Sequence, residues 1–153
     1  MSLFLQAEVI IQLLLAAFLG TLIGWDREYR REPAGLRTHI LVAVGSCLFT
    51  AISVNAFTGD TGRVAAQIVV GIGFLGAGTI VQSGGQPHHL TTAASIWATA
   101  AVGMSVGVGA WLLAIGATVI IWAVLRIVRW FSKLDETGAL PPSPEKLDNT
   151  QKP

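Results

Sequence analysis

Apolar segments of membrane-spanning length take up most of this chain of 153 residues. A helix that crosses a bilayer needs about 20 predominantly apolar residues. That length is met by five segments, at 3–24, 36–57, 63–83, 91–109 and 111–131. Hydrophobic residues make up 52% of the chain, charged residues only 12%, and the mean hydropathy is +0.62. The sequence therefore predicts an all-α, multi-pass transmembrane helical bundle with about five spans.

The basic residues near the span ends predict an orientation. Arg27, Arg30, Arg31 and Arg37 flank the first loop, whereas Arg63 is the one base on the opposite side. The end of the fifth span is flanked by three more bases, Arg126, Arg129 and Lys133. Because basic loops favour the cytoplasmic face, the N-terminus is expected outside the cytoplasm and the C-terminus inside. We expect residues 1–134 to form the transmembrane domain and the polar, proline-rich residues 135–153 to form a disordered cytoplasmic tail.

Composition also excludes several function classes. A net charge of +1 offers no dense basic patch for nucleic acid, so no nucleic-acid partner is expected. The apolar segments make the lipid bilayer the expected partner. Cys47 is the single cysteine, which rules out an intrachain disulfide. His88 and His89 are adjacent, and no further ligand suggests a zinc site. No Ser/His/Asp or Cys/His set has a supporting spacing, so an enzyme is not expected.

The stretch GIGFLGAGTI, at 71–80, has the spacing G-x-G-x-x-G. A dinucleotide loop follows a strand and needs an acidic residue about 20 positions later, but this stretch lies in an apolar segment and the next acid is Asp135. Small residues let membrane helices approach closely. A packing surface or an oligomer seam is therefore expected at Gly71, Gly73, Gly76, Ala77 and Gly78. A bent helix that lines a cavity is the alternative.

Polar residues gather at the predicted cytoplasmic ends of three segments. Because ionisable groups at the membrane are costly, they are candidates for function. The candidates are Asp26, Arg27, Glu28, Arg37, Thr38, His39, Thr91, Thr92 and Ser95. In the third segment, Gln67 lies one turn from Arg63 and nearer the outer face, where it continues a polar path, snorkels or pairs within the bundle.

Asp26 and Glu28 are the candidate metal ligands of this set. Carboxylates, hydroxyls and water provide the oxygen ligands that Mg²⁺ accepts, so these two acids predict a magnesium site. Pairing with neighbouring arginines, which would only fix the loop, is the alternative. Thr91 and Ser95 have a similar alternative, because they are one helical turn apart and could be interhelical hydrogen-bond donors. No cofactor other than Mg²⁺ is suggested.

Four ordered motifs resemble the MgtC/SapB family of bacterial inner-membrane proteins. They are IG followed by DRE (23–28), PAGLRTHILVAVGS (33–46), RVAAQIVVGIGFLGAGTI (63–80) and LTTAASIWATAAVGM (90–104). The resemblance covers roughly residues 20–110. It implies a multi-pass protein of the inner membrane, associated with magnesium homeostasis, adaptation to low magnesium and virulence.

The resemblance leaves two roles open. The protein is expected to transport or sense Mg²⁺, or else to be a non-transporting regulator that docks another membrane complex, such as the F-type ATP synthase. Many members carry a soluble C-terminal domain similar to ACT domains, which is not expected after Asp135. Where the family usually has glycine before the Leu-Thr-Thr motif, this chain has His89, so the turn there is expected to differ.

Overall fold

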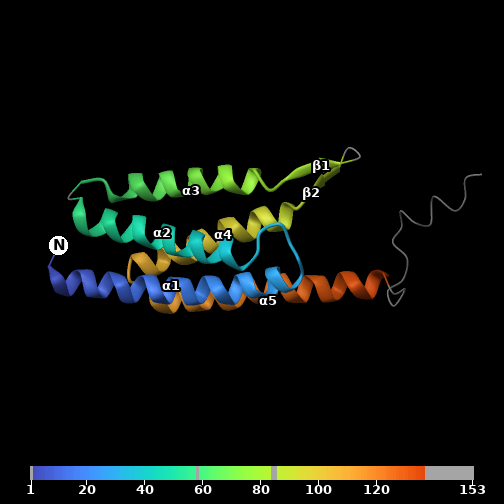
Figure 1. Cartoon of the computed structure of the whole chain (residues 1–153), viewed down its shortest axis with the longest axis horizontal. Coiled ribbons are helices and arrows are strands. Elements are labelled where there is room, and N and C mark those ends of the chain that lie inside the picture. The colour runs from blue at the N-terminus through green and yellow to red at the C-terminus, as the bar shows by residue number, and fades with distance from the viewer. Residues whose placement is uncertain (1, 58, 84–85, 137–153) are drawn as a thin grey trace, which may run out of the picture. The chain divides into compact units, whose positions relative to one another are not determined.

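The protein is described here by a computed structural model that covers residues 2–57, 59–83 and 86–136. Its helices are α1 (Leu3–Tyr29), α2 (Leu36–Ala56), α3 (Thr61–Ala77), α4 (Leu90–Gly107) and α5 (Trp111–Glu136). Two short antiparallel strands, β1 (Val81–Ser83) and β2 (Gln86–His88), join α3 to α4 (Figure 1). The predicted helical fold with five helices is confirmed over the described residues. The small hairpin was not predicted.

Three of these helices are long and apolar enough to cross a membrane. They are α1, α2 and α4, while α3 and α5 contribute shorter apolar stretches, Gly62–Ala77 and Trp111–Ile127. The outward face of α1 is apolar along its length. Its exposed side chains recur every three or four residues, at Ile11, Leu14, Phe18, Leu22 and Trp25. A helix that is apolar on both its packed and its exposed face is typical of a lipid environment, so the chain is a membrane protein.

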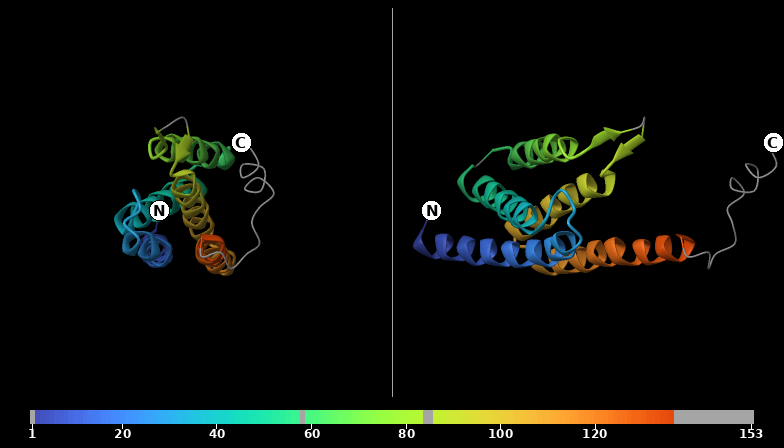
Figure 2. Two further views of the ribbon diagram at one scale, coloured as in Figure 1. Left: turned by 90° about the vertical axis from the view of Figure 1, so that its right-hand side faces the viewer. Right: turned by 45° about the vertical axis from the view of Figure 1, so that its right-hand side comes forward.

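Close glycine contacts hold α1, α2 and α4 together. A Cβ at Gly20 would lie 2.8 Å from the His39 carbonyl oxygen, and one at Gly103 would collide with the backbone carbonyl of Ala43. These contacts bring α2 against α1 on one side and against α4 on the other. Figure 2 shows α2 and α4 lying between α1 and α3. An apolar cluster that includes Val42, Ile72 and Ile96 attaches α3 to the two central helices.

The third helix is shorter than predicted. It ends at Ala77, whereas the apolar segment was expected to continue to residue 83. Gly78 caps the helix and donates its backbone N–H to Phe74, after which Val81 pairs with His88 in the hairpin. The apolar run therefore continues past the helix as a strand. The other glycines of the G-x-G-x-x-G stretch lie inside α3, which excludes a strand–loop–helix nucleotide site.

The boundary between α4 and α5 lies where the sequence predicted it. Helix α4 ends at Gly107 and α5 begins at Trp111. Gly109 between them has a φ of +81°, a left-handed conformation that glycine adopts without steric cost. The chain divides into two compact units, residues 1–121 and 122–153, so α5 belongs partly to each. Within the second unit, the Arg126 guanidinium lies 4.7 Å from the Trp122 ring centroid.

The predicted tail overlaps the last helix. Asp135 and Glu136 belong to α5. Residues 137–153 lie outside the described part of the chain, so the disordered tail stays a prediction.

His89 adopts the backbone conformation that favours glycine. It precedes α4 with φ +67° and ψ +22°, a left-handed geometry that costs a side chain about 1–2 kcal/mol. His89→Gly is therefore expected to raise the free energy of unfolding by about 0.5–1 kcal/mol. This is the relief of strain less the cost of glycine's greater conformational freedom in the unfolded chain. Denaturant titration in detergent would measure this. His88→Gly, in β2, is the control, and an equal gain in both variants would contradict the explanation.

Candidate functional site

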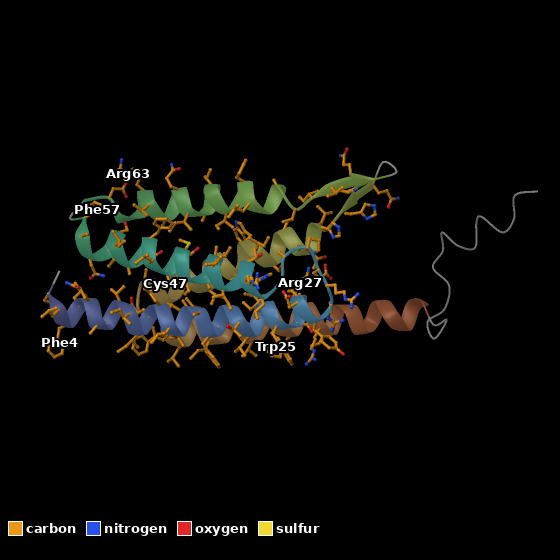
Figure 3. All side chains as sticks on the ribbon, viewed as in Figure 1. Phe4, Trp25, Arg27, Cys47, Phe57 and Arg63 are labelled. Atoms are coloured by element: carbon orange, nitrogen blue, oxygen red, sulfur yellow. The ribbon has the colours of Figure 1, made fainter. Side chains whose placement is uncertain are left out.

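Arg27 is a charged residue buried within the helical bundle. Its side chain is 0% exposed, and it lies at the end of α1 opposite Phe57 and Arg63 (Figure 3). Its Nη2 donates a 2.7 Å hydrogen bond to the Thr92 hydroxyl of α4 and lies 3.1 Å from the Glu32 carboxylate. A buried charge needs such partners because desolvation is expensive. Arg27 thus connects α1, the following loop and α4.

His39 extends these contacts to α2. Its ring is fully buried; Nδ1 lies 2.8 Å from the Gly35 carbonyl oxygen and Nε2 lies 3.1 Å from the Ser95 hydroxyl. Ser95 in turn donates to the carbonyl oxygen of Thr92. The resulting network, Arg27, Glu32, His39, Thr92 and Ser95, is called the Arg27 cluster below. It draws on α1, α2, α4 and the first loop.

The local sequence explains why these groups meet. Gly24 has no side chain, and a Cβ there would lie 2.9 Å from the Cα of Leu36, so α1 and α2 can approach closely where His39 is buried. Arg31 has a φ of +56°, which turns the chain sharply after α1. Glu32 then donates its backbone N–H to the Arg27 carbonyl oxygen. This turn brings the Glu32 carboxylate, 21% exposed, back over the end of α1.

The two candidate magnesium ligands lie beside this cluster, and each contacts a different group. Asp26 accepts a 2.9 Å hydrogen bond from Arg30 one turn later, and this hydrogen bond raises the pKa of the Arg30 guanidinium. Glu28 instead accepts the backbone N–H of Leu36 at 2.9 Å and so caps α2. Side chains two residues apart on a helix do not face each other. Asp26 thus has an arginine partner, as the alternative of pairing expected, whereas Glu28 contacts a backbone N–H and not an arginine.

The described residues contain no group of three or more His, Cys, Asp or Glu side chains that could hold a metal. Mg²⁺ usually retains several waters and needs one or two carboxylates. Glu28 and Glu32 are partly engaged in other contacts, and a cation that binds Glu32 has to compete with the buried Arg27 charge. A fully ligated, resident ion does not fit this donor set, whereas a hydrated ion at a single carboxylate does. The Asp26 and Glu28 site stays a prediction.

Three other predicted site residues do not join the Arg27 cluster. Arg37 and Thr38, at the start of α2, line a groove between α2 and α3. Thr91 is exposed at the start of α4. The structure thus brings together Arg27, His39, Thr92 and Ser95 of the nine candidates. It adds Glu32, which is not among the nine candidates.

Thr99 was not selected from the sequence, although it is fully buried. Its hydroxyl donates to the Ser95 carbonyl oxygen one turn earlier. The four-residue spacing of Ser95 and Thr99 on α4 is the sequence signal that could have found it.

Replacing Glu28 tests its structural role as the cap of α2. Glu28→Ala removes the acceptor for the Leu36 N–H and is expected to lower the free energy of unfolding by about 1 kcal/mol. Glu28→Gln keeps an acceptor oxygen and is expected to lower the free energy of unfolding by less than half of that amount. Denaturant titration of both variants checks the order. Equal losses would show that the cap is not what Glu28 contributes.

Comparisons with known proteins show which family the chain resembles. The MgtC family matches residues 13–134 of the chain. Protein MgtC of Salmonella typhimurium strain LT2 is 47% identical over 125 residues, which cover 82% of this chain and 54% of that protein. Protein MgtC of Brucella abortus strain 2308 is 50% identical over 116 residues, covering 74% and 48%.

A third relative has a magnesium-related name. "Putative magnesium transporter YhiD" of Escherichia coli strain K12 is 43% identical over 132 residues, covering 80% of this chain and 61% of that protein. The chain therefore spans about half the length of the curated relatives it matches. No solved structure matches. Since the family match covers most of the chain and the relatives exceed two fifths identity, the chain belongs to the MgtC family.

Proposed function

We propose that this chain is an inner-membrane protein of bacterial magnesium homeostasis that senses Mg²⁺ at the Arg27 cluster. The observation that carries the proposal is the Arg27–Glu32 ion pair. It couples three parts of the fold, yet its carboxylate is 21% exposed and accessible from outside the bundle. The name of the Escherichia coli relative supports the choice of magnesium.

Sensing would operate through competition for carboxylates. A hydrated Mg²⁺ that binds Glu32 weakens the attraction between this carboxylate and Arg27 and shifts the balance between the paired and unpaired arrangements. An ion changes a conformation only as far as it binds one state more tightly than the other. The loop that carries Glu32 is the element expected to move, because this pair is one of the contacts that hold it to the bundle, beside the hydrogen bond from the Thr92 hydroxyl to the Glu32 carboxylate.

Sensing is preferred to conduction because of the packing of α1, α2 and α4. Gly20, Gly103 and Gly107 each bring one helix backbone against its neighbour, and a Cβ at Gly107 would lie 2.6 Å from the Cys47 carbonyl oxygen. Such contacts favour helices sealed together over a helix bent around an ion path. Transport of Mg²⁺ is the next candidate, and its path would have to avoid this interface.

We further propose five spans with the N-terminus outside and the C-terminus inside. Helix α3 has 17 residues, a length of about 26 Å that nearly crosses a hydrocarbon core. The Arg27 cluster and Arg37 then lie at the cytoplasmic face, as basic residues favour. Labelling of single cysteines from each side, after Cys47 is replaced, tests this arrangement. If Arg37→Cys reacts only with a reagent added outside the cell, the proposed orientation is wrong.

Docking on another membrane complex, such as the F-type ATP synthase, is the second candidate. The exposed apolar faces of the helices favour it. Crosslinking in native membranes tests this idea, and recovery of the chain alone would count against it.

Stability measurements in a magnesium series test the sensing proposal. An ion that binds only the folded protein adds about 2.7 kcal/mol of stability at 100 times its Kd. We expect Mg²⁺ to raise the free energy of unfolding of the wild type. Glu32→Gln is expected to remove this increase, and Glu28→Gln is expected to retain it. Mg²⁺ flux into liposomes that contain the folded protein distinguishes transport. Absence of both a stability response and a flux would refute a direct role of Mg²⁺.

A further inference from the structure

An open groove runs between α2 and α3. It has a volume of about 690 Å³, and its walls are mainly apolar. Gly45 on α2 and Gly71 on α3 both line it, and a Cβ at either position would meet nothing within 4 Å. The groove therefore has room for another backbone to approach both helices. It lies within the first compact unit and does not involve the Arg27 cluster.

Two polar side chains in this groove have no partner among the described residues. Ser46 is 3% exposed and borders the groove, and neither its hydroxyl nor the Gln67 amide makes a hydrogen bond within the described chain. Gln67 is exposed and lies near the middle of α3. An amide without a partner is costly in hydrocarbon. The groove thus calls for an occupant that presents hydrogen-bonding groups at this depth.

A second copy of this chain meets that requirement better than a lipid. Acyl chains cannot hydrogen-bond to Gln67 or Ser46. A glutamine amide has both a donor and an acceptor, so two copies of Gln67 can pair with each other across a two-fold axis, as a symmetric dimer interface requires. Interhelical pairs of this kind, with small residues beside them, are the usual contacts between membrane helices.

We propose that the α2–α3 groove is a dimer interface, in which α3 of one copy packs against α3 of another with the two Gln67 side chains near the axis. The sequence predicted an oligomer seam at five small residues. Gly71 belongs to this groove, whereas Gly76 packs against Ala93 of the same chain and so has an intrachain role. The proposal rests on the five-span topology but is independent of the response to Mg²⁺.

Cysteine crosslinking in native membranes tests the dimer. In a Cys47→Ala background, Gln67→Cys is expected to form a covalent dimer with a short bifunctional reagent. Phe18→Cys, which is exposed in the middle of α1, is the control and is expected to stay monomeric. A Gln67→Cys product no more abundant than the control product, or a product that contains a different protein, would overturn the proposal.

Filling the groove gives a second measurement that does not depend on crosslinking. Gly71→Leu is expected to weaken dimerisation more than tenfold, and Gln67→Leu about tenfold, as measured by single-molecule photobleaching in bilayers. Gly116→Leu in α5 is the matched control, because a Cβ there also meets nothing within 4 Å. Dimers that persist in Gly71→Leu would refute this interface.

The same cysteine distinguishes the two proposals. Reaction of Gln67→Cys with a water-soluble reagent would refute the membrane position of α3 and with it the five-span topology. A cysteine that is shielded from water but gives no dimer would refute the dimer alone.

Discussion

Glu32→Leu is expected to lower the free energy of unfolding by about 3–5 kcal/mol, because it leaves the buried Arg27 charge without its carboxylate. Arg27→Met is expected to cost less, about 1–2 kcal/mol, although Arg27 is the more deeply buried partner. The remaining Glu32 carboxylate is 21% exposed and can turn toward water. The loss of the hydrogen bond to Thr92 then accounts for most of the cost.

The double variant Arg27→Met/Glu32→Leu tests this asymmetry. It removes both charges of the pair, so its stability is expected to be close to that of Arg27→Met and above that of Glu32→Leu. Arg30→Gln is the control, because it breaks the more exposed Asp26–Arg30 pair and is expected to cost less than about 1 kcal/mol. Denaturant titration in detergent measures all four variants. A Glu32→Leu variant as stable as Arg27→Met would show that the ion pair does not stabilise the buried charge.

The helices could be predicted from the sequence because lipid requires long apolar segments with every backbone group paired. The ends of α3 could not be predicted in the same way. Ile80 and Val81 continue the apolar run after Gly78, and hydropathy does not distinguish a helical turn from a strand there. The hairpin depends instead on pairing with residues 86–88, which lie beyond the polar loop.

The Arg27 cluster was predicted in part for a similar reason. Arg27, His39, Thr92 and Ser95 are polar at the ends of apolar segments, so their cost in a membrane makes them visible in the sequence. Glu32 is one of several charges in a loop, and its partner depends on the left-handed turn at Arg31. A non-glycine residue in that conformation gives no sequence signal that identifies it.

The glycines show most clearly what a sequence leaves undetermined. Spacing favoured Gly71, Gly73 and Gly76 as packing positions, but a Cβ at Gly71 or Gly73 would meet open space within one chain. The tight contacts instead occur at Gly20 and Gly24 in α1 and at Gly103 and Gly107 in α4, two pairs whose members are four residues apart. Which face of a helix a glycine occupies depends on the crossing of the helices. That crossing is a property of the whole bundle.

Gly103→Ala is therefore expected to be among the most damaging single-methyl changes in this protein. The added Cβ would collide with the Ala43 carbonyl oxygen and would lie 3.0 Å from the Ala43 Cα, so the backbones of α2 and α4 would have to separate. Overpacking usually costs about 1–3 kcal/mol, and we expect about 3 kcal/mol because the opposing atoms are backbone atoms that cannot rotate away.

Gly73→Ala provides the matched control for this change. It adds the same methyl group inside a helix, but to open space, and it is expected to leave stability unchanged or raise it by up to about 1 kcal/mol through helix propensity. Thermal unfolding in one detergent compares the two variants. Because both replace a helical glycine by alanine, a similar loss in both would mean that glycine flexibility, and not the close approach of α2 and α4, is what the bundle needs.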